Sequence, residues 1–213
     1  MVERSENMKQ LAMLLMLTLS CGCGLNDYQE KMITQQKLMK QIDREKELLN
    51  PSLDVPLSLI EQRKGATYAD VYLRPPQSVD TKPEEKLARD VLMVYPGKEN
   101  IKMYLAFRGK EKEFVKEVIN LVPRTTEVKQ SSTQIKHPSG GKAMRLLQYS
   151  FQHEAKDKTI TNYLLYLTPR GNIAILYQMT SSSVKDKEAV KLSISTLGIG
   201  EDAARRKAFY SSS

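Results

Sequence analysis

The chain has 213 residues, of which 40% are hydrophobic and 27% are charged, and this composition excludes a disordered polymer and favours one globular domain with appendages. The formal charge is +8, but Lys and Arg alternate with Glu and Asp through most of the chain. That mixture is typical of a solvated surface, with a functional polyanion site as the alternative.

The first segment of the chain has the pattern of an export signal. Residues 11–20 form an apolar run of about ten residues, which is too short to span a bilayer but fits the centre of a secretory signal. Two glutamates in residues 1–7 disturb the positive start that such signals need, whereas Lys9 directly precedes the run if translation begins at Met8. The sequence therefore predicts a signal over residues 1–22, with Met8 as its true start.

Both cysteines of the chain lie at the end of this run. The segment resembles a bacterial lipoprotein signal, in which a cysteine after small residues receives diacylglycerol and becomes the first residue. Cys23 follows Gly22 and Cys21, which are both small, whereas Cys21 follows Ser20 and the bulky Leu19. The resemblance implies lipid attachment at Cys23, with Cys21 as the alternative acceptor.

Such an anchor implies that the protein lies in the cell envelope and faces the periplasm. The sequence does not decide between the outer and the inner membrane. A plain secretory signal is the alternative. A CxC metal or redox site is a further alternative, and it lacks a second Cys/His cluster in the sequence.

Residues 23–66 are expected to be a lipidated stalk and a linker. Residues 25–49 contain no Gly or Pro and are rich in helix formers, and Asn50-Pro51 ends the segment. Its apolar residues follow a 3-4 spacing, with Gln35 and Lys46 interrupting the seam. We expect a helical stalk, with a helix docked on the domain or a self-associating coiled coil as alternatives. The residues of the seam are Leu25, Tyr28, Met32, Met39, Ile42 and Leu49.

Residues 67–200 are predicted to form an α+β domain, because alternating segments of strand length are grouped in hairpins and two segments have helical periodicity. We expect an antiparallel β-sheet with a middle and a C-terminal helix packed on it, preceded by the N-terminal stalk. Residues 201–213 are expected to be a frayed basic tail. The strands are expected at 68–76, 90–97, 101–109, 143–155, 159–169 and 172–180, with a further one at 126–130, and the helices at 111–123 and 184–200.

No residue pattern in this domain points to a reaction. Ser139 to Lys142 is a glycine-containing turn without a following helix, and His137 and His153 are too isolated for a triad or a metal site. We therefore predict no catalytic, cofactor-binding or metal-binding residue and a protein that is not an enzyme. An envelope hydrolase of cell-wall or carbohydrate substrates, working through two carboxylates, is the alternative.

The segment "NIAILYQMT" (172–180) followed by "KEAVKLSISTLGI" (187–199) resembles the end of PsbP-like and DcrB-like domains, where a long strand precedes a final helix. The resemblance implies a binding or assembly-stabilising module. The expected partners are the lipid bilayer, through the acyl chains, and an envelope protein or acidic polymer; nucleic acid is not expected, and the oligomeric state is left open. "RRKAFY" (205–210) is expected to touch lipid headgroups or an acidic partner.

Overall fold

A computed structural model of the chain describes residues 3–53, 71–82, 85–87, 92–107, 124–136, 143–169, 173–180 and 183–211, with the side chains of the first helix described from residue 26 onward. The chain divides into two units, Met1–Arg44 and Glu45–Ser213. The expected helix at 111–123, His137 and the turn at 139–142 lie outside the described residues, as does most of the linker.

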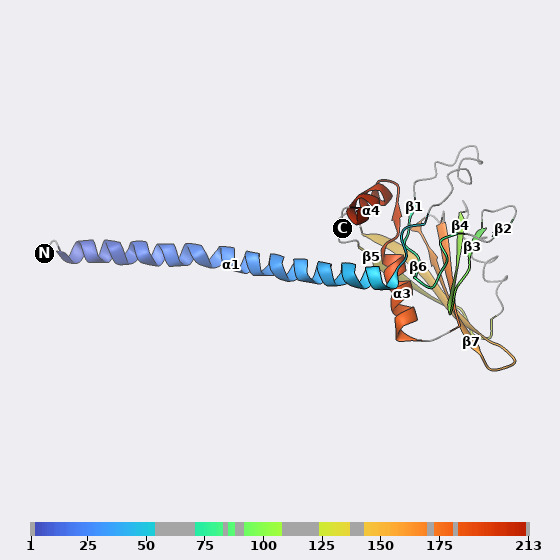
Figure 1. Cartoon of the computed structure of the whole chain (residues 1–213). Coiled ribbons are helices and arrows are strands. Elements are labelled where there is room, and N and C mark those ends of the chain that lie inside the picture. The colour runs from blue at the N-terminus through green and yellow to red at the C-terminus, as the bar shows by residue number, and fades with distance from the viewer. Residues whose placement is uncertain are drawn as a thin grey trace. The chain divides into compact units, whose positions relative to one another are not determined.

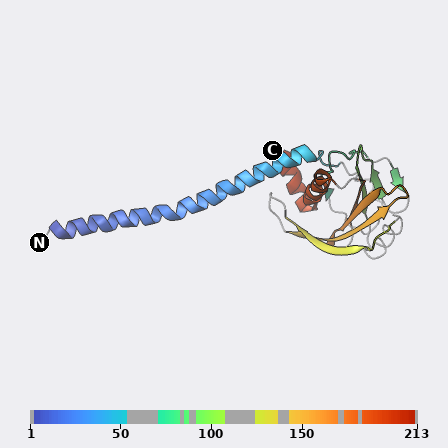
Figure 2. The same cartoon turned by 90° about the horizontal axis from the view of Figure 1, so that it is seen from below.

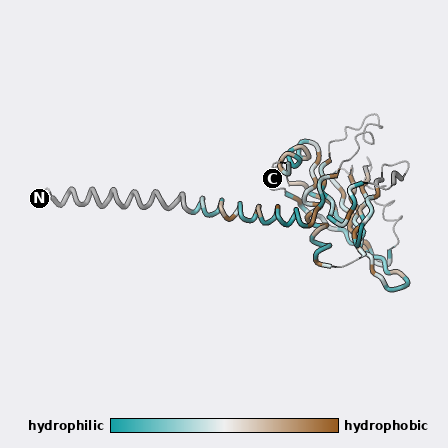
Figure 3. The backbone as a smooth tube through the Cα atoms, in the orientation of Figure 1, coloured by the Kyte–Doolittle hydropathy of each residue, from teal (hydrophilic) through white to brown (hydrophobic). Residues whose placement is uncertain are grey.

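Helix α1 runs over Glu3–Leu48 and contains the whole described part of the first unit. The predicted helix at 25–49 is confirmed, and it ends just before Asn50-Pro51, where proline disfavours a helical residue in front of it. Figure 3 shows that the described part of this helix is largely hydrophilic, with separate apolar positions. The backbone of α1 includes Cys21 and Cys23.

The second unit is built on a seven-stranded antiparallel sheet, which confirms the predicted α+β class (Figure 1). The order of its strands is β2-β3-β4-β8-β7-β6-β5, so β4 and β8 join two groups of sequence-adjacent strands in the middle of the sheet. The predicted meander of the last three long strands is present as β6, β7 and β8. The strands are β2 (Glu85–Leu87), β3 (Leu92–Tyr95), β4 (Ile101–Phe107), β5 (Lys129–Ile135), β6 (Met144–Glu154), β7 (Ile160–Leu167) and β8 (Ile173–Met179).

Both faces of the central strands are buried, because successive side chains of a strand point to opposite faces. In β8, Ile175 and Tyr177 belong to one core cluster and Leu176 belongs to the other. Helix α3 (Val184–Ser195) contributes Val190 and Ile194 to the first cluster. The predicted C-terminal helix therefore packs on the sheet, and it ends at Ser195 with Thr196 as its cap rather than at residue 200.

A second sheet of two short strands lies beside the main one. Strand β1 (Val71–Tyr72) pairs with β9 (Gly198–Ile199). The expected first strand at 68–76 is thus shorter than predicted and is not part of the main sheet. Gly198, which falls within the helix expected over 184–200, lies in β9 instead, after the cap at Thr196.

The frayed tail expected after residue 200 is wrong, because Glu201–Ser211 forms helix α4. Two acids in its first turn complement the helix dipole, and Ala203 and Arg206 are buried on its inner side. Figure 2 shows α3 and α4 on one side of the strands. The expectation failed because α4 is held by buried polar contacts, which hydropathy does not reveal.

Candidate functional site: a pocket of cations and tyrosines

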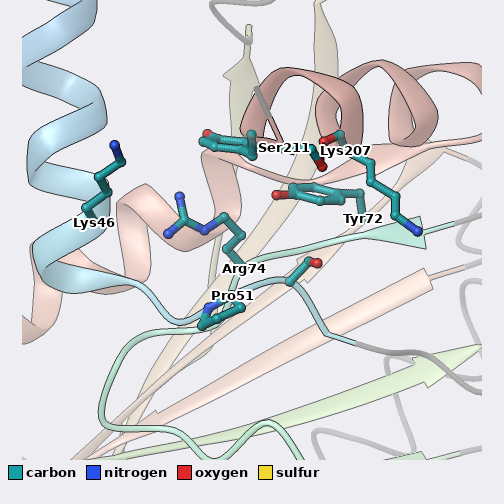
Figure 4. A pocket seen from close by; sticks show the side chains of 8 residues that line it. Lys46, Pro51, Tyr72, Arg74, Lys207 and Ser211 are labelled. Atoms are coloured by element: carbon teal, nitrogen blue, oxygen red, sulfur yellow. Dashed lines mark hydrogen bonds between the residues drawn. The ribbon is translucent and has the colours of Figure 1, made fainter. Parts of the chain in front are cut away.

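A pocket of about 300 Å³ opens between α4, β1 and the last turn of α1. Figure 4 shows Arg74 and Tyr72 in its centre, with Lys46 and Lys207 on opposite sides of them. We call this site the cation–tyrosine pocket. Its lining residues are Lys46, Pro51, Ser52, Tyr72, Arg74, Lys207, Tyr210 and Ser211, and they include three cationic side chains and no carboxylate.

The backbone of Arg74 is fixed by the end of helix α3. The Arg74 N–H donates to Thr196 Oγ1 at 2.9 Å, and the Arg74 carbonyl accepts from Ser193 Oγ at 2.6 Å. Ser193 in turn bonds the Tyr177 hydroxyl at 2.8 Å in the core of the sheet. Residue 74 is therefore placed by a chain of buried hydrogen bonds that begins in the main sheet.

The side chain of Arg74 is fixed as well, and only 10% of it is exposed. Its Nε donates to the Asn50 carbonyl at 3.0 Å, and its Nη1 lies 3.8 Å from Glu45 Oε2. Its guanidinium carbon also lies 4.8 Å from the centre of the Tyr210 ring, within the range of a cation–π contact. Arg74 thus enters the pocket with its orientation already set, which lowers the entropy that a ligand must overcome.

Two tyrosines form the aromatic wall. The rings of Tyr72 and Tyr210 are stacked, with centroids 5.6 Å apart and planes 5° apart. The Tyr210 hydroxyl donates to Glu45 Oε2. Burial raises the pKa of Tyr72 to about 12, and burial together with the bond to Glu45 raises the pKa of Tyr210. Both phenols therefore stay neutral at physiological pH and offer stacking and hydrogen bonding without adding negative charge.

Arg206 lies behind this wall and is only 2% exposed. Its Nη1 donates to the Ser195 carbonyl at 2.8 Å, which satisfies one of the open carbonyls at the end of α3. Its Nε is buried without a hydrogen-bond partner among the described residues, and burial lowers its pKa. Arg206 is therefore a structural group that connects α4 to α3 and adds positive potential near the two tyrosines.

A smaller pocket of about 190 Å³ brings Glu99 and Asp186 to one lining, with Lys98 and Lys185 beside them. Asp186 lies in the first turn of α3, where its N–H donates to Ser183 Oγ at 3.0 Å. Acidic residues are common at this point of a helix because they favour its dipole and cap. This position explains Asp186 without a catalytic role.

Of the residues singled out in the sequence, Lys207 and Tyr210 line the cation–tyrosine pocket, whereas His153 does not. Cys21 and Cys23 lie on α1, in a part whose side chains are not described. His153 lies on β6 and is half-buried, with its Nδ1 lacking a hydrogen-bond partner among the described residues. Within the part of the chain that the structure describes, no three His, Cys, Asp or Glu side chains are grouped for a metal, and no helix is long and apolar enough to cross a membrane.

Sequence reasoning missed the cation–tyrosine pocket. One signal was present, because the basic and aromatic run "RRKAFY" includes Lys207 and Tyr210. The other half of the pocket comes from Tyr72 and Arg74, more than a hundred residues earlier in the chain. Their proximity depends on the pairing of β1 with β9, which no local pattern predicts.

No family model and no curated protein matches the chain.

Proposed function

We propose that the chain is a bacterial envelope lipoprotein, anchored by lipid on Cys23, whose α+β domain is a non-enzymatic module that binds an acidic partner in the cation–tyrosine pocket. The observation that carries the proposal is the lining of this pocket, which has three cations and two neutral tyrosines. The Glu45 carboxylate that contacts Arg74 and Tyr210 is only 1% exposed and is not part of the lining. A protein of formal charge +8 attracts anions at long range, and a pocket concentrates that attraction at one place.

The chemistry of the lining favours phosphate or carboxylate groups. Arg74 offers a planar guanidinium, whereas Lys46 and Lys207 offer point charges on long side chains. The hydroxyl groups of Ser52 and Ser211 add neutral hydrogen-bond donors. A volume near 300 Å³ fits one charged unit of a larger acidic molecule rather than a whole drug-sized ligand.

The anchor in this proposal follows from the signal-like segment and from the resemblance to bacterial lipoproteins. Two or three acyl chains hold a protein at a membrane without a spanning helix. The described part of α1 from residue 26 to Leu48 has the length of about 35 Å, as expected for a stalk. The weak resemblance to PsbP-like and DcrB-like domains also favours a binding module over an enzyme.

The anchor is tested by intact-mass spectrometry and membrane fractionation. We expect a chain that begins at an acylated Cys23. We also expect Cys23→Ala to leave the membrane fraction while the matched variant Cys21→Ala stays in it. Loss of membrane association in Cys21→Ala alone would move the lipid to the alternative cysteine.

The pocket is tested by lysine acetylation of the detergent-solubilised chain, with and without polyphosphate or polyglutamate. We expect both probes to protect Lys46 and Lys207 from acetylation. Lys136 and Lys156, which are exposed and lie outside the lining of the pocket, serve as controls and should stay reactive. Protection of all four lysines to the same degree would mean that the probes bind the charged surface without using the pocket.

An envelope hydrolase is the second candidate, and one observation favours it. Glu99 and Asp186 both line the smaller pocket of about 190 Å³, and a two-carboxylate mechanism requires two such groups in one site. If this candidate is right, the purified chain releases soluble fragments from cell-wall polymer, and both Glu99→Gln and Asp186→Asn abolish the release. Activity that survives both substitutions would exclude these two carboxylates as the catalytic pair.

A further inference from the structure

An apolar stripe follows one side of α1 within the first unit. Tyr28, Met32 and Met39 are 62%, 41% and 65% exposed, which is unusual for large apolar side chains in a regular array. They lie at helical spacings of four and seven residues, and Gln35 and the half-buried Ile42 continue the same spacing. We call Tyr28, Met32, Gln35, Met39 and Ile42 the α1 stripe.

The spacing of the stripe is that of a heptad repeat. Met32 and Met39, seven residues apart, occupy one core position of the repeat. The other core position lies three residues after each methionine, at Gln35 and Ile42, and four residues before Met32, at Tyr28. With 100° per residue, these five positions fall within a sector of about 80° on the helix surface. Glu30 and Lys37 lie on the opposite side of the helix, as does Ile33, which is 51% exposed. Three of the four exposed large apolar side chains on the described part of α1 thus belong to the stripe.

We propose that the α1 stripe is the interface through which two copies of this chain form a parallel, in-register coiled coil. A second copy is the partner that fits best, because the same spacing then meets itself and each apolar residue faces its own counterpart. Gln35 also meets Gln35, and two amides in a seam can hydrogen-bond to each other and so favour one register. The parallel direction, though not the stripe itself, depends on the proposed lipid anchor at the start of the helix.

The charges beside the stripe permit this arrangement. In a parallel coiled coil, the residue just before a core position at Met32 or Met39 in one helix faces the residue that lies five positions later in the partner helix. For an in-register pair this brings Lys31 beside Gln36 and Leu38 beside Asp43. No like charges meet at these flanking contacts, so electrostatic repulsion does not oppose the pairing.

The stripe is short for an independent coiled coil, which usually needs three to four heptads. Two chains anchored in one membrane meet at a much higher effective concentration than in dilute solution. The dimer is therefore expected in the membrane and expected to dissociate when the chain is extracted and diluted. Such a reversible dimer places two cation–tyrosine pockets on one assembly and increases avidity for a polymeric ligand.

Disulfide crosslinking in isolated membranes tests the interface, because the mature chain has no other free thiol once Cys23 is acylated and Cys21 is replaced by alanine. In that background, Met32→Cys and Met39→Cys place a thiol in the stripe. Glu30→Cys and Lys37→Cys are the matched controls, each two residues away on the opposite side of the helix. We expect the two stripe variants to form at least fivefold more disulfide-linked dimer than the two controls after mild oxidation.

Equal crosslinking at all four positions would show random collision and overturn the proposal, as would the absence of dimer at both stripe positions. Crosslinking at only one of Met32 and Met39 would overturn the parallel, in-register arrangement. Membrane fractionation of each variant shows separately whether the lipid anchor itself has failed. In the Cys21→Ala background, which keeps Cys23 for acylation, a chain with Met32→Glu and Met39→Glu should stay in the membrane fraction but lose the dimer that an amine-reactive crosslinker captures in the parent.

Discussion

The seven-stranded sheet and the region around the cation–tyrosine pocket are both buried, but in different ways. In the sheet, side chains such as Leu105 and Leu165 are fully covered by other apolar groups. Behind the pocket, Glu45, Arg74 and Arg206 are at least 90% covered, and each depends on directional partners. We call the latter group, with Tyr72 and Tyr210, the polar junction. A buried apolar side chain needs only neighbours that fill the space around it, because the hydrophobic effect has no direction. A buried polar side chain needs a hydrogen-bond or charge partner at a defined position.

The largest effect on stability is expected in the sheet. Leu105 is completely buried, so Leu105→Ala leaves a cavity and should lower the free energy of unfolding by about 3 kcal/mol. Urea unfolding measures the change, and the exposed Lys129→Ala on β5 should change it by less than about 0.5 kcal/mol. Similar losses in the two variants would contradict the assignment of this face as core.

The polar junction is expected to show strong coupling between its members. Glu45→Gln removes the charge that faces Arg74 and weakens the bond from Tyr210, and should cost about 2 kcal/mol. In a double-mutant cycle with Arg74→Gln, the double variant should lose about 1 kcal/mol less stability than the sum of the two single variants. Additive losses would mean that the two side chains do not interact in the folded chain.

A glycine of β9 tests the close packing of Arg206. A Cβ at Gly198 would lie 2.7 Å from Arg206 Cδ, so Gly198→Ala forces this side chain to move and should cost about 1.5 kcal/mol. In an Arg206→Ala background, the same change should cost clearly less, because the clashing atoms are gone. Equal costs in both backgrounds would assign the effect to the backbone near Ala203 instead.

Alkaline pH should weaken both regions, since each contains buried tyrosines. Burial raises the pKa of Tyr72, Tyr95 and Tyr166 to about 12, above the usual value of 10. The stabilisation from a raised pKa is complete below pH 10 and is lost as the pH rises to 12, because the unfolded chain releases its protons first.

Tyr72→Phe removes one of these titrating groups. Between pH 9 and pH 11, the free energy of unfolding of this variant should therefore fall by about 1 kcal/mol less than that of the parent, as measured by thermal unfolding. The difference is measured against the parent at each pH, so that any change common to all pH values cancels. An identical pH dependence in the two proteins would show that Tyr72 is not protected in the folded state.

The sequence predicts the apolar part of this fold well and the polar part poorly. Strands β4, β6, β7 and β8 follow from their alternation, and helix α3 follows from its periodicity, because burial leaves a direct mark on hydropathy. Helix α4 was missed because its packing relies on a buried arginine, a residue type that is usually exposed. The cation–tyrosine pocket was missed for a second reason: its members are joined by the long-range pairing of β1 with β9.

The comparison also gives the two regions different roles. The sheet provides stability, and the polar junction sets the orientation of Arg74 and the two tyrosines at the pocket. Charge reversal at Lys207, an exposed residue of α4, should therefore change the free energy of unfolding by less than about 0.5 kcal/mol and act mainly on binding.

The most direct test of this account is the affinity of the full chain for polyphosphate, measured for two charge-matched double variants. We expect Lys46→Glu with Lys207→Glu to weaken binding at least tenfold and Lys136→Glu with Lys156→Glu to weaken it less than threefold. Equal losses in the two variants, or no binding of polyphosphate or polyglutamate by the parent chain, would contradict the proposal that this pocket binds an acidic partner.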